Sequence, residues 1–496
     1  MKRTILIDVE PMSTSVALFE DGRLNEFHIE DKAVDRITGN IYKGRVENVL
    51  KGLESAFVNI GRGRNGFLNV GEVLDDRTGL SSMAPRSLQG GVGDHIMVQV
   101  TKEETGQKGA RLTDNISLPG RYVVYCPHID FVAISNKITD PARREMLTKL
   151  LEKHKPKGGG LIARTVCIAA KKTDILAEIH GLQTLYEKIE ADYEKASGVG
   201  LIHSEGDLVF RALRDMLTAD VERIICNDHN TIAGLQSRLE EMGSEYAHKI
   251  EYCASSYDVW DIFDIGGEIE KLFERKVELP SGGSLVIDPT EALTAIDVNT
   301  GRFTAGDHEE TVFLTNLEAA KEIARQLRLR NIGGIIVVDF IDMADEAHRA
   351  EVVEALRNEV LLDRIKTRVR DMTELGLVEI TRKKVGQPLG RKLMAPCEHC
   401  QGRGHRPNAL FAARKLRAFV NRALADHNWK NVVVRMHAGL LEYMFSSRYF
   451  ADICQNAWQD RLVYLVPDPR VKQLEYVITG NNDVALTVPA GARLLY

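Results

Sequence analysis

The chain has 496 residues, 44% of them hydrophobic, and its 65 lysines and arginines against 71 acidic residues give a formal net charge of −6. This length predicts roughly two to four domains, because single cores stop growing well below it, and the composition excludes wholesale disorder. No apolar run reaches the roughly 18–20 residues of a membrane helix, and Asp8 interrupts the N-terminal one. We therefore expect a soluble cytoplasmic protein with no membrane segment and no signal peptide.

The cysteines and the local charge add two expectations. The seven cysteines are odd in number and mostly isolated, which argues for a reducing compartment rather than a disulfide framework. Residues 380–425 contain eleven lysines and arginines but one acid, Glu398. Such a segment indicates either a localised site for a polyanion or a solvated basic face, about equally.

The first hundred residues are rich in short strand-like runs. The runs 4–10 and 15–19 alternate as strands do, and a turn follows at Asp21-Gly22. Two strands cannot form a domain alone, so we expect them to join a later part of the chain. From Gly39 to about residue 114, some five short strands with glycine corners predict a small barrel of the oligonucleotide-binding (OB) type.

Two phenylalanines stand out in this barrel. Phe57 and Phe67 alternate onto one barrel face, and Arg62 and Arg64 lie in the turn between them. Aromatic rings beside cations hold single-stranded nucleic acid by base stacking and backbone neutralisation. Taken alone, however, the pattern favours two core phenylalanines.

A second unit is expected over residues 115–205. A glycine-rich loop, 154–160, precedes a predicted strand over 161–163, and Arg164-Thr165 follows directly. A guanidinium and a hydroxyl side by side can clamp a terminal phosphate, although a surface salt bridge explains a lone dipeptide better. A long amphipathic helix is predicted over 171–197 and a helix-rich segment over 206–250.

The strongest local signal is a strand–helix–strand pattern between residues 293 and 339. The strand 293–299 ends on polar residues, a capping box of Thr315 with Glu318 predicts the start of the helix, and the strand 333–339 follows. A connection of this kind makes the two strands parallel. Asp297 and Asp339 should therefore emerge at the same sheet edge, where open α/β sheets place their sites.

These two carboxylates indicate a metal site. With the amide of Asn299 they form an all-oxygen set that suits hydrated Mg²⁺, which can activate water against a phosphodiester. The alternative is structural: Asp297 would cap a turn and Asp339 would pair with a lysine. Two carboxylates on adjacent parallel strands favour the metal.

Cys397 and Cys400 form half of a zinc knuckle, because the glycines behind them, Gly402 and Gly404, let backbone N–H groups approach the thiolates. Zinc needs four ligands. Either His399 and His405 complete the site, or two chains share one ion. A thioredoxin-like redox pair is less well supported, because no strand–Cys-x-x-Cys–helix context is present.

In chain order, these motifs resemble those of the ribonuclease E/G family. The resemblance runs from near residue 1 to about 410, and the segment 294–343 is its most specific part. The motifs that carry it are GNIYKGRV, SAFVNIG, GLIART, AIDVNTGRF, TNLEAAKEIARQLRLRNIGGIIVVDFIDM, TELGLVEITRKK and CEHCQGRGH.

The resemblance implies a multidomain α/β plus β fold. Its parts would be an RNase H-like domain from residues 1–35 and 206–272, an inserted S1 (OB-type) barrel over 36–114, a 5′-sensor region over 115–205, a DNase I-like catalytic domain over 273–392, a zinc link over 393–408 and a small C-terminal domain over 409–496.

The resemblance also implies roles for single residues. Asp297 and Asp339 would bind catalytic Mg²⁺ with support from Asn299, and Cys397 and Cys400 would supply half of a zinc site shared between two chains. A pocket for a 5′-monophosphate would be formed by Arg164, Thr165 and the backbone at Val124. In the barrel, RNA would be contacted by Phe57, Phe67 and Lys108. In place of an arginine pair found in many relatives, this chain has Asn136-Lys137, which loses the bidentate guanidinium fork.

The expected function is that of a Mg²⁺-dependent endoribonuclease. It would cut single-stranded, A/U-rich RNA by in-line attack of water, respond to a 5′-monophosphate, and act in rRNA processing and mRNA decay as a homodimer or a dimer of dimers joined through the zinc link. The alternatives are a non-catalytic S1-type RNA-binding protein and a DNA nuclease on the same α/β platform.

Overall fold

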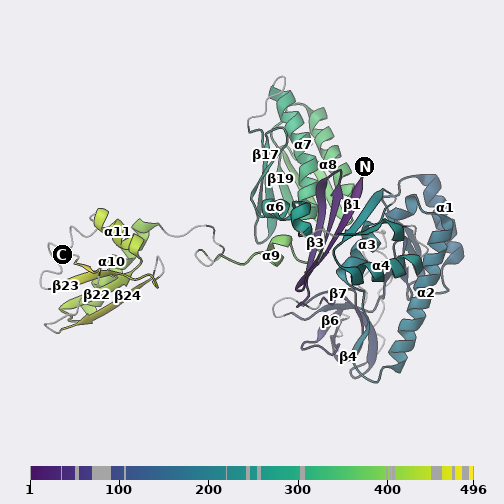
Figure 1. Ribbon diagram of the computed structural model, residues 1–496, viewed down its shortest axis with the longest axis horizontal. Coiled ribbons are helices and arrows are strands. Elements are labelled where there is room, and N and C mark those ends of the chain that lie inside the picture. The colour runs from purple at the N-terminus through teal and green to yellow at the C-terminus, as the bar shows by residue number, and fades with distance from the viewer. Residues whose placement is uncertain are drawn as a thin grey trace. The chain divides into compact units, whose positions relative to one another are not determined.

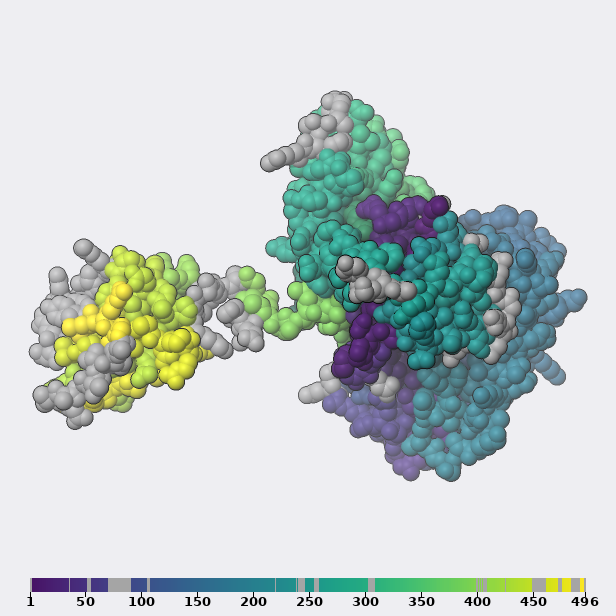
Figure 2. All heavy atoms as spheres, viewed as in Figure 1, coloured from purple at the N-terminus to yellow at the C-terminus, as the bar shows by residue number. Residues whose placement is uncertain are grey.

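The chain folds into two compact units, Met1–Leu393 and Met394–Tyr496, which are drawn in the computed structural model of Figure 1. Figure 2 shows the same residues as filled surfaces. The structure describes residues 2–34, 36–50, 55–69, 91–104, 108–218, 220–241, 246–253, 258–301, 308–397, 400, 402, 404, 408–447, 461–471, 475–482 and 491–494.

The opening strands join a later segment, as expected. Strand β1 pairs antiparallel with β2 on one side and parallel with β14 on the other, so the sheet order is β15-β14-β1-β2-β3. The strands of this sheet are β1 (Arg3–Val9), β2 (Ser13–Glu20), β3 (Arg23–Asp31), β14 (Val221–Cys226) and β15 (Ile250–Tyr252). The helices of the same segment are α3 (Leu208–Met216), α4 (His229–Glu241), α5 (Val259–Ile262) and α6 (Ile265–Lys271).

The predicted barrel is present. Five strands close on themselves in the order β4-β5-β6-β8-β7, because β4 also pairs with β7, and β13 adds to the outside of β4. Closure of a small five-stranded sheet around a core is the OB-type arrangement. The strands are β4 (Ile41–Leu50), β5 (Ser55–Asn59), β6 (Gly66–Asn69), β7 (His95–Lys102), β8 (Arg111–Thr113) and β13 (Gly200–His203).

A four-stranded sheet follows, in the order β11-β12-β10-β9. Its strands are β9 (Leu118–Pro119), β10 (Val123–Cys126), β11 (Val132–Ile134) and β12 (Gly160–Ala163). Two helices pack against it: α2 (Lys172–Lys195), where a helix was expected, and α1 (Pro141–His154), for which we made no prediction.

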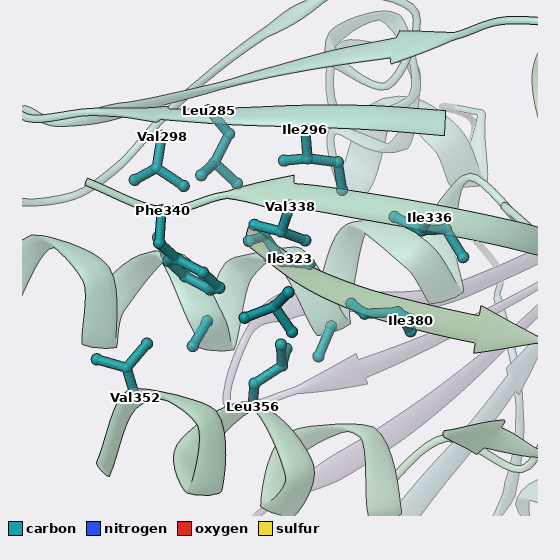
Figure 3. Close-up of a cluster of buried hydrophobic side chains, with 14 of the residues drawn as sticks. Leu285, Ile296, Val298, Ile323, Ile336, Val338, Phe340, Val352, Leu356 and Ile380 are labelled. Atoms are coloured by element: carbon teal, nitrogen blue, oxygen red, sulfur yellow. The ribbon is translucent and has the colours of Figure 1, made fainter. Parts of the chain in front are cut away.

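The largest sheet has six strands in the order β16-β17-β18-β19-β21-β20. One face is buried under α7 and α8, and Figure 3 shows its side chains meeting those of the two helices. The opposite face carries exposed residues at alternate positions of β18 and β19. These elements are β16 (Lys276–Glu278), β17 (Ser284–Pro289), β18 (Leu293–Asn299), β19 (Gly334–Asp339), β20 (Thr367–Met372), β21 (Leu377–Arg382), α7 (His308–Leu329) and α8 (Glu346–Leu361), with α9 (Leu389–Leu393) closing this unit.

The predicted start of α7 is wrong. The helix already begins at His308, so Thr315 lies inside it, fully buried, and its hydroxyl donates to the carbonyl of Thr311 at 2.8 Å. Glu318 accepts hydrogen bonds from the backbone N–H and hydroxyl of Ser281 rather than closing a capping box. The capping pattern was therefore a coincidence of residue types inside a longer helix.

The C-terminal unit is a four-stranded sheet, order β24-β22-β23-β25, with helices α10 and α11 packed on it. Its elements are α10 (Ala409–Asp426), β22 (Asn431–Met436), α11 (Ala438–Ser446), β23 (Leu462–Pro467), β24 (Tyr476–Asn481) and β25 (Arg493–Leu494). Among the helices that the structure describes in either unit, none is long and apolar enough to cross a membrane. The assignment of segments to RNase H-like and DNase I-like domains, and the six domain boundaries, stay predictions.

Candidate active site

Asp297 and Asp339 lie directly opposite each other. They are Cα partners on the parallel strands β18 and β19. Both side chains are exposed, whereas their neighbours Ile296, Val298 and Val338 are buried on the helix-covered face. The juxtaposition expected from the sequence is therefore present, on the open face of the sheet.

The amide of Asn299 completes this group. Its Nδ2 donates to Oδ2 of Asp297 at 2.7 Å. The strand then ends in a tight turn at Gly301, whose φ is +60° and where a Cβ atom would lie 2.3 Å from the carbonyl oxygen of Gly282. The structural alternative gave Asp339 a lysine partner; among the described residues no cation forms an ion pair with Asp339 or with Asp297.

The donor set suits a hydrated magnesium ion. The part of the chain that the structure describes contains no group of three or more histidine, cysteine or acidic side chains placed to hold a metal. Mg²⁺ keeps several of its waters and commonly takes only one or two protein carboxylates. Asp297 and Asp339 supply such a pair.

Asn316, which the sequence analysis missed, holds the segment just beyond Asp339. It is fully buried on α7, its Nδ2 donates to the carbonyl of Ile341 at 2.8 Å, and its Oδ1 accepts from the Ile341 N–H at 3.2 Å. The sequence could have pointed to Asn316 through its position among the apolar residues on the buried side of α7, because a buried amide needs hydrogen-bond partners.

Glu309 anchors the same segment from the first turn of α7. Its carboxylate accepts from the backbone N–H groups of Ala344 and Asp345 at 3.0 and 3.2 Å, and it contacts the His348 ring at 3.1 Å. Asn316 and Glu309, both on α7, thus hold residues 341 and 344–345 of the segment that follows Asp339.

The predicted sensor residues Arg164 and Thr165 follow β12 directly. Arg164 Nη1 donates to the carbonyl of Gly120 at 2.5 Å and Nη2 to Oδ1 of Asp215 at 2.6 Å. The Thr165 hydroxyl lies 3.0 Å from that of Ser135, which follows the parallel strand β11. The salt bridge considered as the alternative is therefore present, and phosphate binding by Arg164 stays a prediction.

Asp215 belongs to α3 and was not expected to touch Arg164. Burial alone would raise the pKa of this carboxyl, but the Arg164 and Arg214 guanidiniums outweigh burial and hold the pKa well below its usual value. Asp215 is therefore ionised, and it joins α3 to the end of β12.

Two further residues of this region take different places. Val124 is the cross-strand partner of Ile162 in the antiparallel pair of β10 and β12. The neighbouring pair, Val123 with Ala163, directly precedes Arg164. The Lys137 ammonium donates to the carbonyl of Leu361 at 2.6 Å and to that of Asp363, at the C-terminal end of α8. Lys137 thus ties this region to the C-terminal end of α8, where a cation is favoured by the helix dipole.

The barrel presents its two phenylalanines outward. Phe57 and Phe67 are Cα partners on β5 and β6, and their ring centroids are 5.7 Å apart at 64°. Phe57 is 36% exposed, whereas neighbouring residues of the same strands are buried. The interpretation of these rings as core residues is therefore wrong. Lys108 is exposed on the same barrel.

The cysteine pair has the features of a knuckle. The backbone N–H of Gly404 donates to Sγ of Cys400 at 3.3 Å, and Gly402 and Gly404 both have positive φ. Cys397 is exposed. Two thiolates fit half of a tetrahedral zinc site. His399 and His405 lie outside the described residues.

Comparison with known proteins identifies the family. The family model described as Ribonuclease E/G matches residues 117–385. The chain is 38% identical over 412 residues to Ribonuclease G of Escherichia coli strain K12, covering 82% of this chain and 84% of that protein. It is 38% identical over 408 residues to Ribonuclease G of Haemophilus influenzae (81% and 83%), and 40% identical over 372 residues to Ribonuclease E of a Nostoc species (74% and 54%).

Proposed function

The chain belongs to the ribonuclease E/G family and is an endoribonuclease of RNA processing, and from this premise we propose that it cuts single-stranded, A/U-rich RNA with Mg²⁺ and responds to a 5′-monophosphate. The observation that carries the proposal is the cross-strand pairing of Asp297 with Asp339 on an open sheet face. Two facing carboxylates repel each other unless a cation lies between them.

In this proposal Asp297 and Asp339 hold the magnesium ion. When bound, Mg²⁺ supplies charge neutralisation at the phosphate and a more acidic water. The hydrogen bond from Asn299 fixes the orientation of the Asp297 carboxylate, and Asn299 is exposed on the same face of β18 as Asp297. Asn316 and Glu309 hold the chain beyond Asp339, so the second carboxylate has little freedom to move.

RNA would reach this site from the barrel. Phe57 and Phe67 form an outward aromatic pair on which bases can stack, and the exposed Lys108 can contact a phosphate. Exposed cations of the basic segment 380–425 would add phosphate contacts; Arg382 would not, because it is buried in an ion pair with Asp363. Because such contacts release counterions, binding should weaken steeply with salt.

The response to the 5′ end is assigned to Arg164 and Thr165, with the backbone at Val124. Support comes from their place at the ends of the parallel strands β11 and β12, next to the hydroxyl of Ser135. Gly120 and Asp215 each take one N–H of the Arg164 guanidinium and so hold its plane. The remaining N–H donors would make charge-assisted bonds to a terminal phosphate.

We assign Cys397 and Cys400 to a structural zinc ion shared between two chains, which would make the protein a homodimer or a dimer of dimers. The N–H···S bond at Cys400 supports thiolate ligation, and two cysteines leave two coordination positions for a partner. Roles in rRNA processing and mRNA decay in the cytoplasm complete the proposal.

The test is cleavage of one short unstructured RNA, prepared with either a 5′-monophosphate or a 5′-hydroxyl, with Mg²⁺ present. We expect both to be cut and the monophosphate form to be cut faster. Asp297→Asn should lower the rate by at least about 100-fold with RNA affinity nearly unchanged, whereas Asp371→Asn, at an exposed carboxylate of β20 in the same sheet, should have no effect.

Three outcomes would change this conclusion. Equal cutting of the two RNAs would remove the sensor. Equal loss of binding and cleavage in Asp297→Asn would remove the metal assignment. Binding without any cutting would favour the non-catalytic RNA-binding protein, and better cutting of single-stranded DNA than of RNA would favour the DNA nuclease, since 2′-hydroxyl contacts select RNA.

A further inference from the structure

We propose that the exposed face of α10 in the C-terminal unit is a second binding surface for single-stranded RNA. Phe411 and Phe419 would stack on bases, and Arg414, Lys415 and Arg422 would contact the phosphates. We call these five residues the α10 stripe. The inference rests on the proposed function, because it takes RNA as the ligand of the whole chain.

The spacing of the stripe follows one face of the helix. From Phe411, the next members lie three, four, eight and eleven positions along, so all five project to the same side. At 1.5 Å per residue the stripe is about 17 Å long. This length accommodates a short stretch of an extended single strand.

The opposite side of α10 is already used in the core. Ala413, Leu416 and Val420 are buried against the sheet of the C-terminal unit, on which α10 lies in Figure 1. On the stripe, in contrast, Phe411 is 55% exposed and Phe419 is 42% exposed. Large exposed aromatic side chains between cations need an explanation that core packing does not provide.

The charge of the stripe is of one sign. From Ala409 to Ala425 the helix contains no acidic residue, and Asp426 comes only at its end. Arg414, Lys415 and Arg422 form no ion pair with another described residue, unlike Arg435 and Arg470, which pair with Asp468. Three cations that have no acidic partner among the described residues, beside two rings, match the phosphates and bases of a single strand.

The ring of Phe419 is held in place. Its centroid lies 5.1 Å from that of Tyr476 on β24, with the planes tilted by 56°. A ring fixed by an aromatic neighbour loses little conformational entropy when a base stacks on it.

Two other occupants fit less well. A second copy of the chain meeting α10 across a two-fold axis would bring six cations of the two stripes into one interface with no acidic residue of either stripe, and an excess of like charge disfavours such an interface. An anionic membrane surface favours a helix with an apolar face free to insert, whereas the apolar face of α10 is occupied by the sheet. A polyanion with stackable faces fits both features.

The experiment measures RNA affinity in the full chain with Asp297→Asn, so that cleavage does not interfere. The probe is a short fluorescent oligouridine, titrated at several salt concentrations. We expect the triple substitution Arg414→Ala, Lys415→Ala, Arg422→Ala to lower the slope of log Kd against log salt by about 2, because each phosphate contact on a single strand contributes about 0.7. Lys430→Ala, at an exposed cation of the same unit outside α10, is the matched control.

Base stacking is tested separately. Phe411→Ala and Phe419→Ala should each weaken binding about tenfold, and Phe411→Leu, which keeps apolar area but removes the ring, should weaken it nearly as much. Leu410→Ala, at the adjacent and equally exposed apolar residue, should leave Kd unchanged.

The outcomes separate the inference from the proposed function. An unchanged slope in the triple variant would overturn the stripe while RNA binding by Phe57 and Phe67 stands. A change of oligomeric state on sedimentation of the phenylalanine variants without RNA, with Kd unaltered, would assign the face to a second copy. If the stripe variants lose binding to phosphatidylglycerol vesicles while their Kd for RNA is unaltered, the α10 stripe binds a membrane instead. No measurable RNA binding by the parent protein would overturn the proposed function itself.

Discussion

Asp297 and Asp339 are cross-strand partners on adjacent parallel strands, and both carboxylates are exposed on the face opposite the one that α7 and α8 cover. Neighbouring strands are about 4.8 Å apart, so the two charges repel at short range. A bound divalent cation reverses the sign of this interaction. The same geometry therefore destabilises the metal-free sheet locally and creates affinity for Mg²⁺.

Magnesium should stabilise the six-stranded sheet. At ten times the dissociation constant, a ligand that binds only the folded state contributes about 1.4 kcal/mol. Amide hydrogen exchange in β18 and β19 should therefore slow on addition of Mg²⁺, and Asp297→Asn should abolish the slowing while Asp371→Asn keeps it. If Mg²⁺ slows amide hydrogen exchange equally in Asp297→Asn and Asp371→Asn, the ion binds elsewhere.

Asn316→Ala should lower kcat by about 10- to 100-fold, because the buried amide positions the chain beyond Asp339 without touching substrate. RNA affinity should change less than about twofold. Gln326→Ala, which removes another buried polar side chain of α7, controls for lost stability. If kcat falls by a similar factor in Asn316→Ala and Gln326→Ala, Asn316 contributes to the stability of the fold and not to positioning the chain beyond Asp339.

Asp215→Asn should reduce the preference for a 5′-monophosphate by about tenfold, because Arg164 loses the charged partner that orients its guanidinium. The readout is the ratio of cleavage rates for the monophosphate and hydroxyl forms of one RNA. The rate with the 5′-hydroxyl form should not change. Glu187→Gln, at an exposed carboxylate of α2, is the control. If Arg164→Ala abolishes the preference for the 5′-monophosphate but Asp215→Asn leaves the ratio of rates unchanged, Asp215 does not position Arg164.

Asp8 makes the opening sheet sensitive to pH. Burial, followed by the charges of Glu10 and Asp258, raises the pKa of this carboxyl from 3.8 to about 6. Between these values the folded state holds a proton that the unfolded state has released, so stability falls as pH rises and the loss is complete above about pH 6. At about 1.4 kcal/mol per unit of pKa, the loss of stability is at most about 3 kcal/mol.

Asp8→Asn keeps an acceptor for the 2.7 Å hydrogen bond from Asn227 but cannot ionise. Hydrogen exchange in β1 and β14 should therefore be similar in the two proteins near pH 4 and slower in the variant at pH 7. An equal difference at both pH values would show that ionisation of Asp8 does not matter.

Zinc content should be about one ion per two chains, and a chelator should separate the chains, because each supplies only Cys397 and Cys400. Cys400→Ser should lose both the zinc and the dimer, whereas the buried Cys126→Ser should lose neither. One zinc per chain, with monomers that survive chelation, would instead point to His405 as an internal ligand.

Much of the site could be predicted from local sequence patterns. The alternation in 293–299 and 333–339 predicted two strands, and the helix-length segment between them implied that the strands are parallel; this was enough to bring Asp297 and Asp339 together. The barrel strands were predicted from glycine corners in the same way. These features depend on residues near in sequence, where periodicity is informative.

The errors share a different cause. Thr315 and Glu318 have the residue types of a capping box, but burial on the sheet extends α7 to His308 and gives Glu318 another partner in Ser281. Phe57 and Phe67 looked like core residues because hydrophobicity alone does not say which barrel face points outward. Each of these outcomes was decided by tertiary packing.

The sequence by itself determined the chemistry available to this protein: carboxylates at the ends of apolar strands, aromatic rings beside cations, a cysteine pair followed by glycines, and the family motifs that join them. Only the tertiary structure decided which of these groups meet. It placed Asp215 against Arg164, Asn316 against Ile341 and Lys137 against the end of α8. Such contacts join residues far apart in the chain, where strand register and helix docking, rather than any local pattern, set the distances.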